Sequence, residues 1–171
     1  IGNASPAGDS LVGLYLLDAI VELESMTGKR LIPIEDYITG PRKTVRHSDE
    51  MIVAVRIPTR EPECHHYRKV GPRRANAISK LSFGGVFSHE NSMIIDVRMA
   101  FGAMAPVVIR DKSFEKSLIG LSKAGIKAKK KAIIDHYRML LAPIDDQRST
   151  AVYRKKTALA LLAEFIDLIT D

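Results

Sequence analysis

The sequence predicts an α+β fold in two parts, and three observations support this prediction. Of the 171 residues, 46% are hydrophobic and 27% are charged, as in ordinary globular proteins, which excludes a disordered or collagen-like chain. The stretch Pro58–Glu63 combines two prolines with charged residues and predicts a linker between residues 1–60 and residues 64–171. Beyond this linker, strand-like segments are followed by helix-like segments, which predicts a three-stranded antiparallel sheet packed on three helices.

The first part mixes helical and strand patterns. Its opening helix has Leu11 and Leu14 at helical spacing, and Asp9 or Ser10 can accept the free backbone N–H groups at its start. Alternation of apolar and polar residues then predicts a β-hairpin. The predicted elements are a helix over 10–19, strands over 19–25 and 30–33 around a turn at 27–29, a helical turn over 34–38 and a strand over 51–57.

The second part changes from the two-residue period of strands to the period of helices. Two long segments flank the polar turn His89–Ser92 and predict an antiparallel hairpin, to which a short preceding strand is added. The last segment carries its apolar residues on one helical face. The predicted elements are strands over 67–70, 79–87 and 93–102 and helices over 113–121, 124–141 and 150–170, with the helices on one face of the sheet.

Charge is unevenly distributed along the chain, whose formal net charge is +6. Residues 1–63 hold seven Lys/Arg and ten Asp/Glu, which gives −3, whereas residues 64–171 hold 19 Lys/Arg and ten Asp/Glu, which gives +9. A basic part attracts phosphates, an acidic protein partner or nucleic acid. Nucleic acid is not expected as a partner, because the chain has no Trp, only 6% aromatic residues and no recognisable nucleic-acid-binding motif.

Several features indicate a reducing, aqueous compartment. The apolar runs are far shorter than the roughly 18 residues that span a bilayer, so no membrane association is expected. Cys64 is the one cysteine, so no internal disulfide can form, and we expect a cytoplasmic location. The chain begins with Ile1 rather than Met and shows no signal peptide, and we expect that a preceding segment is missing from it.

The opening stretch Ile1–Asp9 contains the residues best suited to hold a ligand. Its glycines and small residues leave the backbone open to close approach, and Ser5 and Asp9 add side-chain acceptors. A helix N-terminus follows, which favours an anion. A turn that ends in a helix cap explains the same residues without a ligand, and both interpretations stay open at this point.

Neither a metal site nor a catalytic centre is predicted. Cys64, His65 and His66 are adjacent, but neighbouring strand residues point to opposite faces, and no second group of ligands stands at a zinc spacing. A nucleophile motif such as Gly-x-Ser-x-Gly is also missing, so no catalytic residue is identified.

The phrase Ile-Gly-Asn-Ala-Ser-Pro-Ala-Gly-Asp at residues 1–9 resembles the second flavin-binding motif of the FAD subunits of molybdenum hydroxylases, the xanthine dehydrogenase and carbon monoxide dehydrogenase family. The resemblance extends along nearly all of the chain. It implies that residues 1–60 are the C-terminal part of a PCMH-type FAD-binding domain and that residues 64–171 are a C-terminal domain like that of the carbon monoxide dehydrogenase flavoprotein. Further segments match the family in order: 40–44, 49–52, 56–58, 67–80, 97–106 and 148–154.

The resemblance implies an electron-transfer role. In the family, a molybdenum cofactor in a large subunit hydroxylates the substrate, and electrons pass through 2Fe–2S clusters in a small subunit to FAD and then to NAD or another acceptor. The cofactor of this chain would be FAD, in a site that is incomplete because the N-terminal flavin lobe is absent. The clusters belong to a partner, since Cys64 alone cannot supply four ligands. The alternative is a truncated relative that has lost the flavin and acts as a protein-interaction module.

The resemblance also implies which residues face the flavin: Asn3, Ser5, Asp9, Ile52 and Lys69. Asp9 matches a carboxylate that hydrogen-bonds the cofactor, and its alternative role is the helix cap. Asn3 and Ser5 can instead serve turn geometry, and Ile52 can be a buried strand residue. Lys69 matches a lysine near the pyrimidine end of the flavin, where a cation stabilises negative charge on the reduced ring. Its alternative role is that of an exposed strand lysine.

Arg73 and Arg74 follow Gly71 and Pro72 in a loop that borders the flavin in the family. Arginine suits the recognition of phosphate or carboxylate groups. The alternative is that both side chains are solvated.

Overall fold

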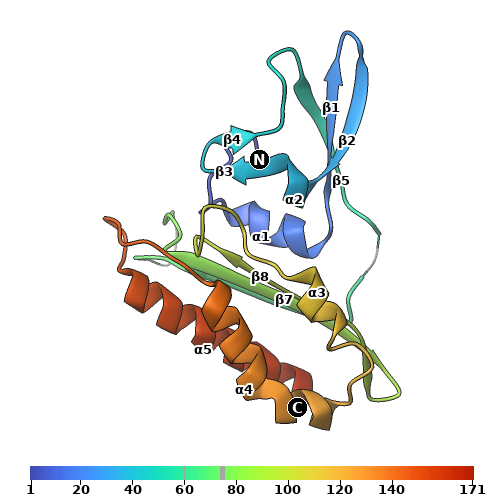
Figure 1. Cartoon of the computed structure of the whole chain (residues 1–171), viewed down its shortest axis with the longest axis vertical. Coiled ribbons are helices and arrows are strands. Elements are labelled where there is room, and N and C mark those ends of the chain that lie inside the picture. The colour runs from blue at the N-terminus through green and yellow to red at the C-terminus, as the bar shows by residue number, and fades with distance from the viewer. Residues whose placement is uncertain (60, 74–75) are drawn as a thin grey trace.

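The computed structural model describes residues 1–59, 61–73 and 76–171, and these residues form two three-stranded sheets, one two-stranded sheet and five helices. In chain order the elements are α1 (Asp9–Leu16), β1 (Ile20–Ser25), β2 (Gly28–Pro33), α2 (Ile34–Tyr37), β3 (Ile38–Gly40), β4 (Lys43–Thr44), β5 (Met51–Arg56), β6 (Cys64–Val70), β7 (Leu81–Glu90), β8 (Met93–Gly102), α3 (Lys112–Lys116), α4 (Lys123–Leu140) and α5 (Ala151–Thr170). The small β3–β4 pair lies beside the first sheet (Figure 1). This architecture confirms the predicted α+β class.

The first sheet has the strand order β2-β1-β5, and its neighbouring strands are antiparallel. β1 and β2 form the predicted hairpin, with Ser25 opposite Gly28 at its end. Val21 and Leu23 of β1 are fully buried on one face of this sheet, in the same apolar cluster as residues of α1 and α2. The first part therefore has its own core, which α1 shares with the second part.

The second sheet has the order β6-β7-β8 and is also antiparallel, as predicted. The turn of its hairpin is tighter than the predicted turn over residues 89–92, because Glu90 pairs with Met93 and leaves Asn91 and Ser92 to form the turn. The φ values of Asn91 and Ser92 are 51° and 64°, as a two-residue type I′ turn requires. The strand β7 therefore extends three residues beyond its predicted end.

Helices cover both faces of the second sheet, because α1 of the first part packs on the face opposite the one that the long helices of the second part cover, as predicted for the latter. α1 lies on one side of β7 and β8, and α4 and α5 lie on the opposite side (Figure 1). An added Cβ at Gly84 would lie 2.6 Å from Leu16 Cδ1 of α1, and one at Gly85 would lie 2.6 Å from the Phe165 ring of α5. These two adjacent glycines of β7 allow a helix to approach each face closely.

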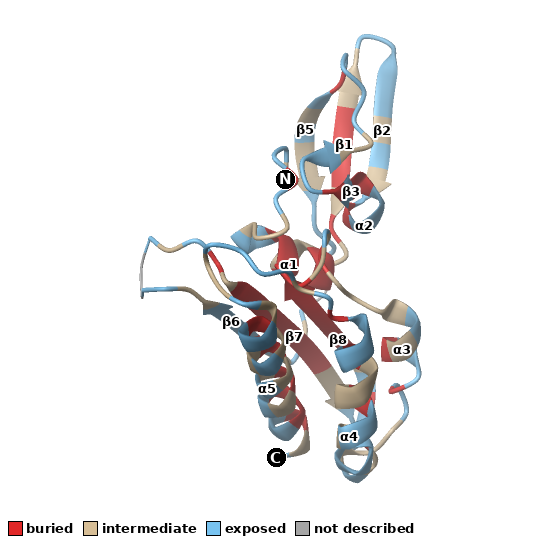
Figure 2. Cartoon of the chain, turned by 60° about the vertical axis from the view of Figure 1, so that its left-hand side comes forward, coloured by how far each residue is buried: buried red, intermediate tan, exposed pale blue. Residues whose placement is uncertain are grey.

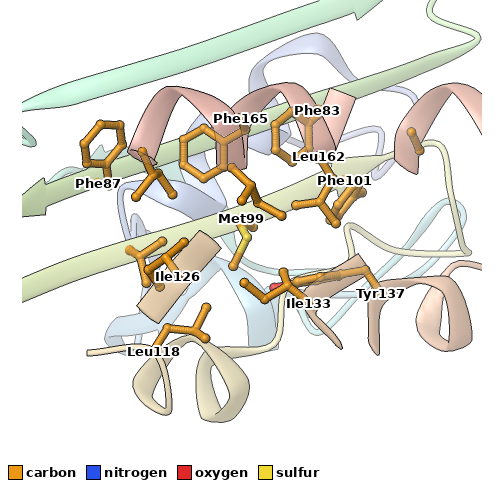
Figure 3. Close-up of a cluster of buried hydrophobic side chains, with 14 of the residues drawn as sticks. Phe83, Phe87, Met99, Phe101, Leu118, Ile126, Ile133, Tyr137, Leu162 and Phe165 are labelled. Carbon is orange, nitrogen blue, oxygen red and sulfur yellow. The ribbon is translucent and has the colours of Figure 1, made fainter. Parts of the chain in front are cut away.

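The larger apolar core lies between the second sheet and the helices α4 and α5, and buried residues line both faces of β7 and β8 (Figure 2). Figure 3 shows Phe83, Phe101 and Phe165 together in this core. The ring centroid of Phe83 is 4.9 Å from that of Phe101 and 5.7 Å from that of Phe165, and Tyr137 of α4 packs on Phe101 at 5.0 Å. Burial of a side chain of this size stabilises a fold by about 1.5–3 kcal/mol. The core thereby fixes the loops that leave this sheet.

The helix predicted over 113–121 is wrong in its second half, since α3 ends at Lys116. After α3 the chain continues in isolated hydrogen-bonded turns as far as Leu121, and Gly120 within them adopts a φ of 81°. The chain pairs instead with the start of β8, where Gly120 N–H donates to the Ile94 carbonyl at 2.8 Å and Ile94 N–H donates to Leu121 at 2.9 Å. Contact with a distant strand decides the local structure here.

Across the part of the chain that the structure describes, no helix combines the length and the apolar character that crossing a membrane requires.

Candidate functional site

The loop Ile1–Gly8 lies where the two parts meet, and backbone hydrogen bonds fix it on both sides. Arg42 N–H, in the β3–β4 turn, donates to the Ala4 carbonyl at 3.0 Å. Ala103 N–H, just after β8, donates to the Pro6 carbonyl at 2.8 Å. Ala4 is 1% exposed and has a φ of 42°, which is uncommon for alanine. The loop is therefore held between the β3–β4 turn and the end of β8.

Asp9 and Lys69, two of the predicted site residues, form an ion pair beside this loop. Lys69 Nζ of β6 lies 2.5 Å from Asp9 Oδ2 at the first position of α1, and Ser79 Oγ donates to Asp9 Oδ1 at 3.0 Å. The Tyr67 hydroxyl donates to the Asp9 carbonyl at 3.1 Å. The side chains of Asp9 and Lys69 are 53% and 29% exposed, so both can reach a ligand.

The cap predicted from Asp9 or Ser10 is wrong. The N-cap position of α1 is Gly8, which has no side chain, and the Asp9 carboxylate turns to Lys69 and Ser79 instead. The hydrogen bond from the Lys69 ammonium lowers the pKa of Asp9, burial opposes this effect, and the Ser79 hydroxyl adds to it. Asp9 is thus a stabilised anion paired with a cation.

The other three predicted residues lie around the same loop but apart from this pair. Ile52 of β5 is partly buried against the core of the first part, and its Cδ1 lies 3.8 Å from where a Cβ on Gly2 would stand. Asn3 and Ser5 line a separate cavity. The structure brings Asp9 and Lys69 into direct contact and places Ile52, Asn3 and Ser5 along the rest of the loop.

That cavity has a volume of about 780 Å³, which is in the range of ligand pockets. Its walls come from segments that are distant in the sequence: residues 2–7, the turn at 41–42, the loop 103–106, the loop 142–148 and Arg154 of α5. Three arginines, Arg42, Arg148 and Arg154, are among the residues that line it. We refer to it as the arginine cavity.

Ser79 and Tyr67 were missed in the sequence as partners of Asp9. Tyr67 could have been found, because it stands two residues before Lys69 in a strand and so shares its face. Ser79 offered no such signal, since its place beside Asp9 follows from the pairing of Val70 with Leu81 between β6 and β7. Only the folded sheet brings this serine to α1.

The adjacent histidines do not converge, since His66 is buried and His65 is exposed on β6. Among residues 1–59, 61–73 and 76–171, no group of three or more His, Cys, Asp or Glu side chains is arranged to hold a metal ion. Arg73 donates through Nε and Nη2 to the Asn76 carbonyl at 3.1 and 2.5 Å and so closes its own loop. Arg74 lies outside the described residues.

Comparisons with known families cover both parts of the chain. A family profile described as the CO dehydrogenase flavoprotein C-terminal domain matches residues 66–169. A second profile, described as the FAD binding domain in molybdopterin dehydrogenase, matches residues 1–60.

Individual relatives are subunits of dehydrogenases. The glyceraldehyde dehydrogenase medium chain of Sulfolobus acidocaldarius is 28% identical over 94% of this chain and 56% of its own length. The xanthine dehydrogenase FAD-binding subunit of Escherichia coli O157:H7 is 32% identical over 68% of this chain and 41% of its own length. The chain therefore spans about half the length of the curated relatives it matches.

Solved structures share the fold. A structure of reconstituted CO dehydrogenase from Oligotropha carboxidovorans matches with a TM-score of 0.83 and 23% identity, over 95% of this chain and 56% of that chain. Quinoline 2-oxidoreductase from Pseudomonas putida 86 matches with a TM-score of 0.80 and 18% identity, over 99% of this chain and 58% of that chain.

Proposed function

Because the chain belongs to the family of FAD-binding medium subunits of molybdenum hydroxylases, which includes those of xanthine dehydrogenase and carbon monoxide dehydrogenase, we propose that it forms the part of such a subunit that faces the flavin ring. Residues 1–60 are then the C-terminal part of the FAD-binding domain, and residues 64–171 are the C-terminal flavoprotein domain. The two family matches, at 1–60 and 66–169, support this division.

The observation that carries the proposal is the contact between Asp9 and Lys69 at 2.5 Å. The edge of an isoalloxazine ring presents carbonyl acceptors and an imide N–H donor. The Lys69 ammonium can donate to such a carbonyl, and the Asp9 carboxylate can accept from such an N–H. Both side chains are partly exposed, so the donor and acceptor set fits this group.

FAD supplies one- and two-electron redox chemistry when bound, and the protein supplies position and electrostatics. Lys69 stabilises negative charge that grows on the reduced ring, and Asp9 holds the ammonium in place. Ile52, lying next to Gly2, offers an apolar surface for packing. Asn3 and Ser5 contribute polar groups from the loop.

The assembled enzyme contains an iron–sulfur subunit and a molybdenum-cofactor subunit in this proposal, together with an N-terminal flavin lobe. Electrons reach FAD from 2Fe–2S clusters and leave to NAD or another acceptor. Cys64, the one cysteine of the sequence, cannot supply the four ligands of a cluster, so the proposal assigns the clusters to the iron–sulfur subunit. The formal charge of +9 on residues 64–171 suits contact with an acidic partner.

The test is the flavin content of the whole chain, purified alone and after co-expression with an N-terminal flavin lobe and an iron–sulfur subunit. We expect bound flavin, seen as yellow absorbance, in the co-expressed complex. Asp9→Ala should lower the ratio of flavin to protein, whereas Asp135→Ala, which breaks an exposed ion pair with Arg138 on α4, should leave it unchanged.

Colourless protein in both states would contradict the proposal. If the partners still co-purified, the result would support the alternative of a flavin-free interaction module.

A further inference from the structure

The arginine cavity carries an excess of positive charge. Arg42, Arg148 and Arg154 line it together with a single carboxylate, that of Asp146. Asp146 Oδ1 already accepts hydrogen bonds from Arg148 N–H at 2.8 Å, Ser149 N–H at 3.2 Å and Arg154 Nη2 at 2.5 Å. The carboxylate therefore fixes its own loop and binds Arg154. Within residues 1–59, 61–73 and 76–171, no carboxylate forms an ion pair with the guanidinium group of Arg42 or Arg148.

Several donor groups of these arginines have no hydrogen-bond acceptor among the described residues. Arg154 is 3% exposed, and in the part of the chain that the structure describes its guanidinium has one acceptor besides Asp146, the Ala103 carbonyl at 3.5 Å. The Nε atoms of Arg148 and Arg154 are buried and have no partner among the described residues. The side chain of Arg42 makes no hydrogen bond or ion pair to any described residue either. Buried donors without acceptors are costly, and a bound acceptor relieves this cost.

The walls of the cavity are rigid and locally strained. Ala4, Arg42 and Ala103 have φ values of 42°, 59° and 61°, and none of them is a glycine. Two backbone hydrogen bonds described above, from Arg42 and Ala103 to the loop 1–8, lock these conformations in place. Strained backbone of this kind persists where the surroundings fix it, and it concentrates at ligand sites.

The remaining wall is apolar and stiff. Pro6, Pro41, Pro106 and Pro143 line the cavity, and Ile144 beside them is 69% exposed. A ligand that carries both an anionic group and an apolar surface would match this combination of charge and wall. Asn3 and Ser5 of the loop line the cavity, whereas Asp9 and Lys69 do not. This ligand therefore adjoins the loop but is separate from the proposed contact of Asp9 and Lys69 to the flavin ring edge.

We propose that the arginine cavity binds an oxyanion, a phosphate or a carboxylate, that is attached to an apolar group. Arg42 and Arg148 supply the accessible donors. Arg154 binds Asp146 and thereby holds the loop that carries Arg148 in place. Guanidinium groups suit both oxyanions because their N–H groups form paired, charge-assisted hydrogen bonds. The apolar group packs against Ile144 and the neighbouring prolines.

The test is a titration of the whole chain, without flavin, with inorganic phosphate, phenyl phosphate, acetate and benzoate. Binding is followed by the NMR signals of the backbone amides and of the arginine Nε–H groups. We expect saturable binding, tighter for the two phenyl compounds and weaker at high salt. Arg148→Gln should weaken it about tenfold, which corresponds to about 1.4 kcal/mol. Arg42→Gln, at an exposed residue, should weaken it without affecting the fold.

Arg138→Gln is the matched control, because Arg138 is exposed on α4, pairs with Asp135 at 2.8 Å and does not line the cavity. Tighter binding of the phosphates assigns the site to a phosphate ester, and tighter binding of the carboxylates assigns it to an acidic side chain. Both results support an oxyanion site. Failure of all four compounds to saturate the signals, or equal weakening by Arg138→Gln, would overturn it.

Discussion

Asp9 gains an ion pair at a position where the sequence indicated a helix cap. The Lys69 ammonium lowers the pKa of its carboxyl group, burial opposes this, and the Ser79 hydroxyl lowers it further. Because the folded pKa lies below the ordinary value of 3.8, the pair stabilises the fold fully above that pH, and the contribution is lost as the pH falls through the folded pKa. The same pH dependence should govern flavin binding through Asp9.

The variant Ser79→Ala removes one of the hydrogen bonds that lower this pKa, so the titration midpoint of Asp9 should rise toward 3.8. Since Ser79 is 1% exposed, we also expect a loss of stability of about 1 kcal/mol. The midpoint is measured from the NMR shift of the Asp9 carboxyl carbon. Ser117→Ala, which removes a local hydrogen bond to the Phe114 carbonyl, serves as the control. An identical Asp9 midpoint in both variants would show that Ser79 does not act on Asp9.

The elements show how far local sequence determines this fold. The hairpins and the long helices follow from periodicity, but the sequence cannot show that α3 stops at Lys116, because Ile94 of β8 draws residues 120–121 away from the helix. The position of α1 on the second sheet was also missed, because it too depends on contacts between residues that are distant in the sequence. In the site, Lys69 could be identified from its motif, whereas Ser79 depends on strand pairing that forms only in the folded sheet.

The close approach of helices to both faces of β7 predicts that Gly85→Ala destabilises the fold by about 1–3 kcal/mol, because the new methyl group would overlap the Phe165 ring. Gly13→Ala is the matched control. A Cβ at Gly13 meets nothing within 4 Å, so this change in α1 should stabilise the fold by about 0.5–1 kcal/mol. Urea unfolding measures both values. A Gly85→Ala variant as stable as the parent chain would rule out tight packing at this point.

Across the whole molecule, a network of charges ties the two parts together. Arg98 of β8 donates to the Leu16 carbonyl at the end of α1 at 2.7 Å, where a cation satisfies the free end of the helix. Asp18 accepts from Arg98 at 3.0 Å, Arg110 at 2.8 Å and Lys112 at 2.8 Å. The network therefore joins the end of α1 to the strand and loop of the second part.

We expect Asp18→Asn to destabilise the chain by about 1–2 kcal/mol in urea unfolding, because three cations lose a shared carboxylate. The Asp18 side chain is 36% exposed, so we expect a smaller loss of stability than for a fully buried ion pair. Asparagine tolerates the φ of 50° at this position, so backbone strain does not contribute. Asp167→Asn breaks an exposed pair with Lys130 and should change stability by less than about 0.5 kcal/mol. Equal effects of the two variants would show that the network does not join the parts.

The proposed contact of Lys69 with the flavin ring is tested most directly by the reduction potential of the flavin in the co-expressed complex. Lys69→Met removes a cation that stabilises the reduced ring, so we expect the two-electron potential to fall by about 30 mV or more, or the flavin to be lost. Lys127→Met, at an exposed lysine of α4, should leave both the potential and the flavin content unchanged. Full flavin content with an unchanged potential in Lys69→Met would contradict the placement of the flavin at Lys69 and Asp9.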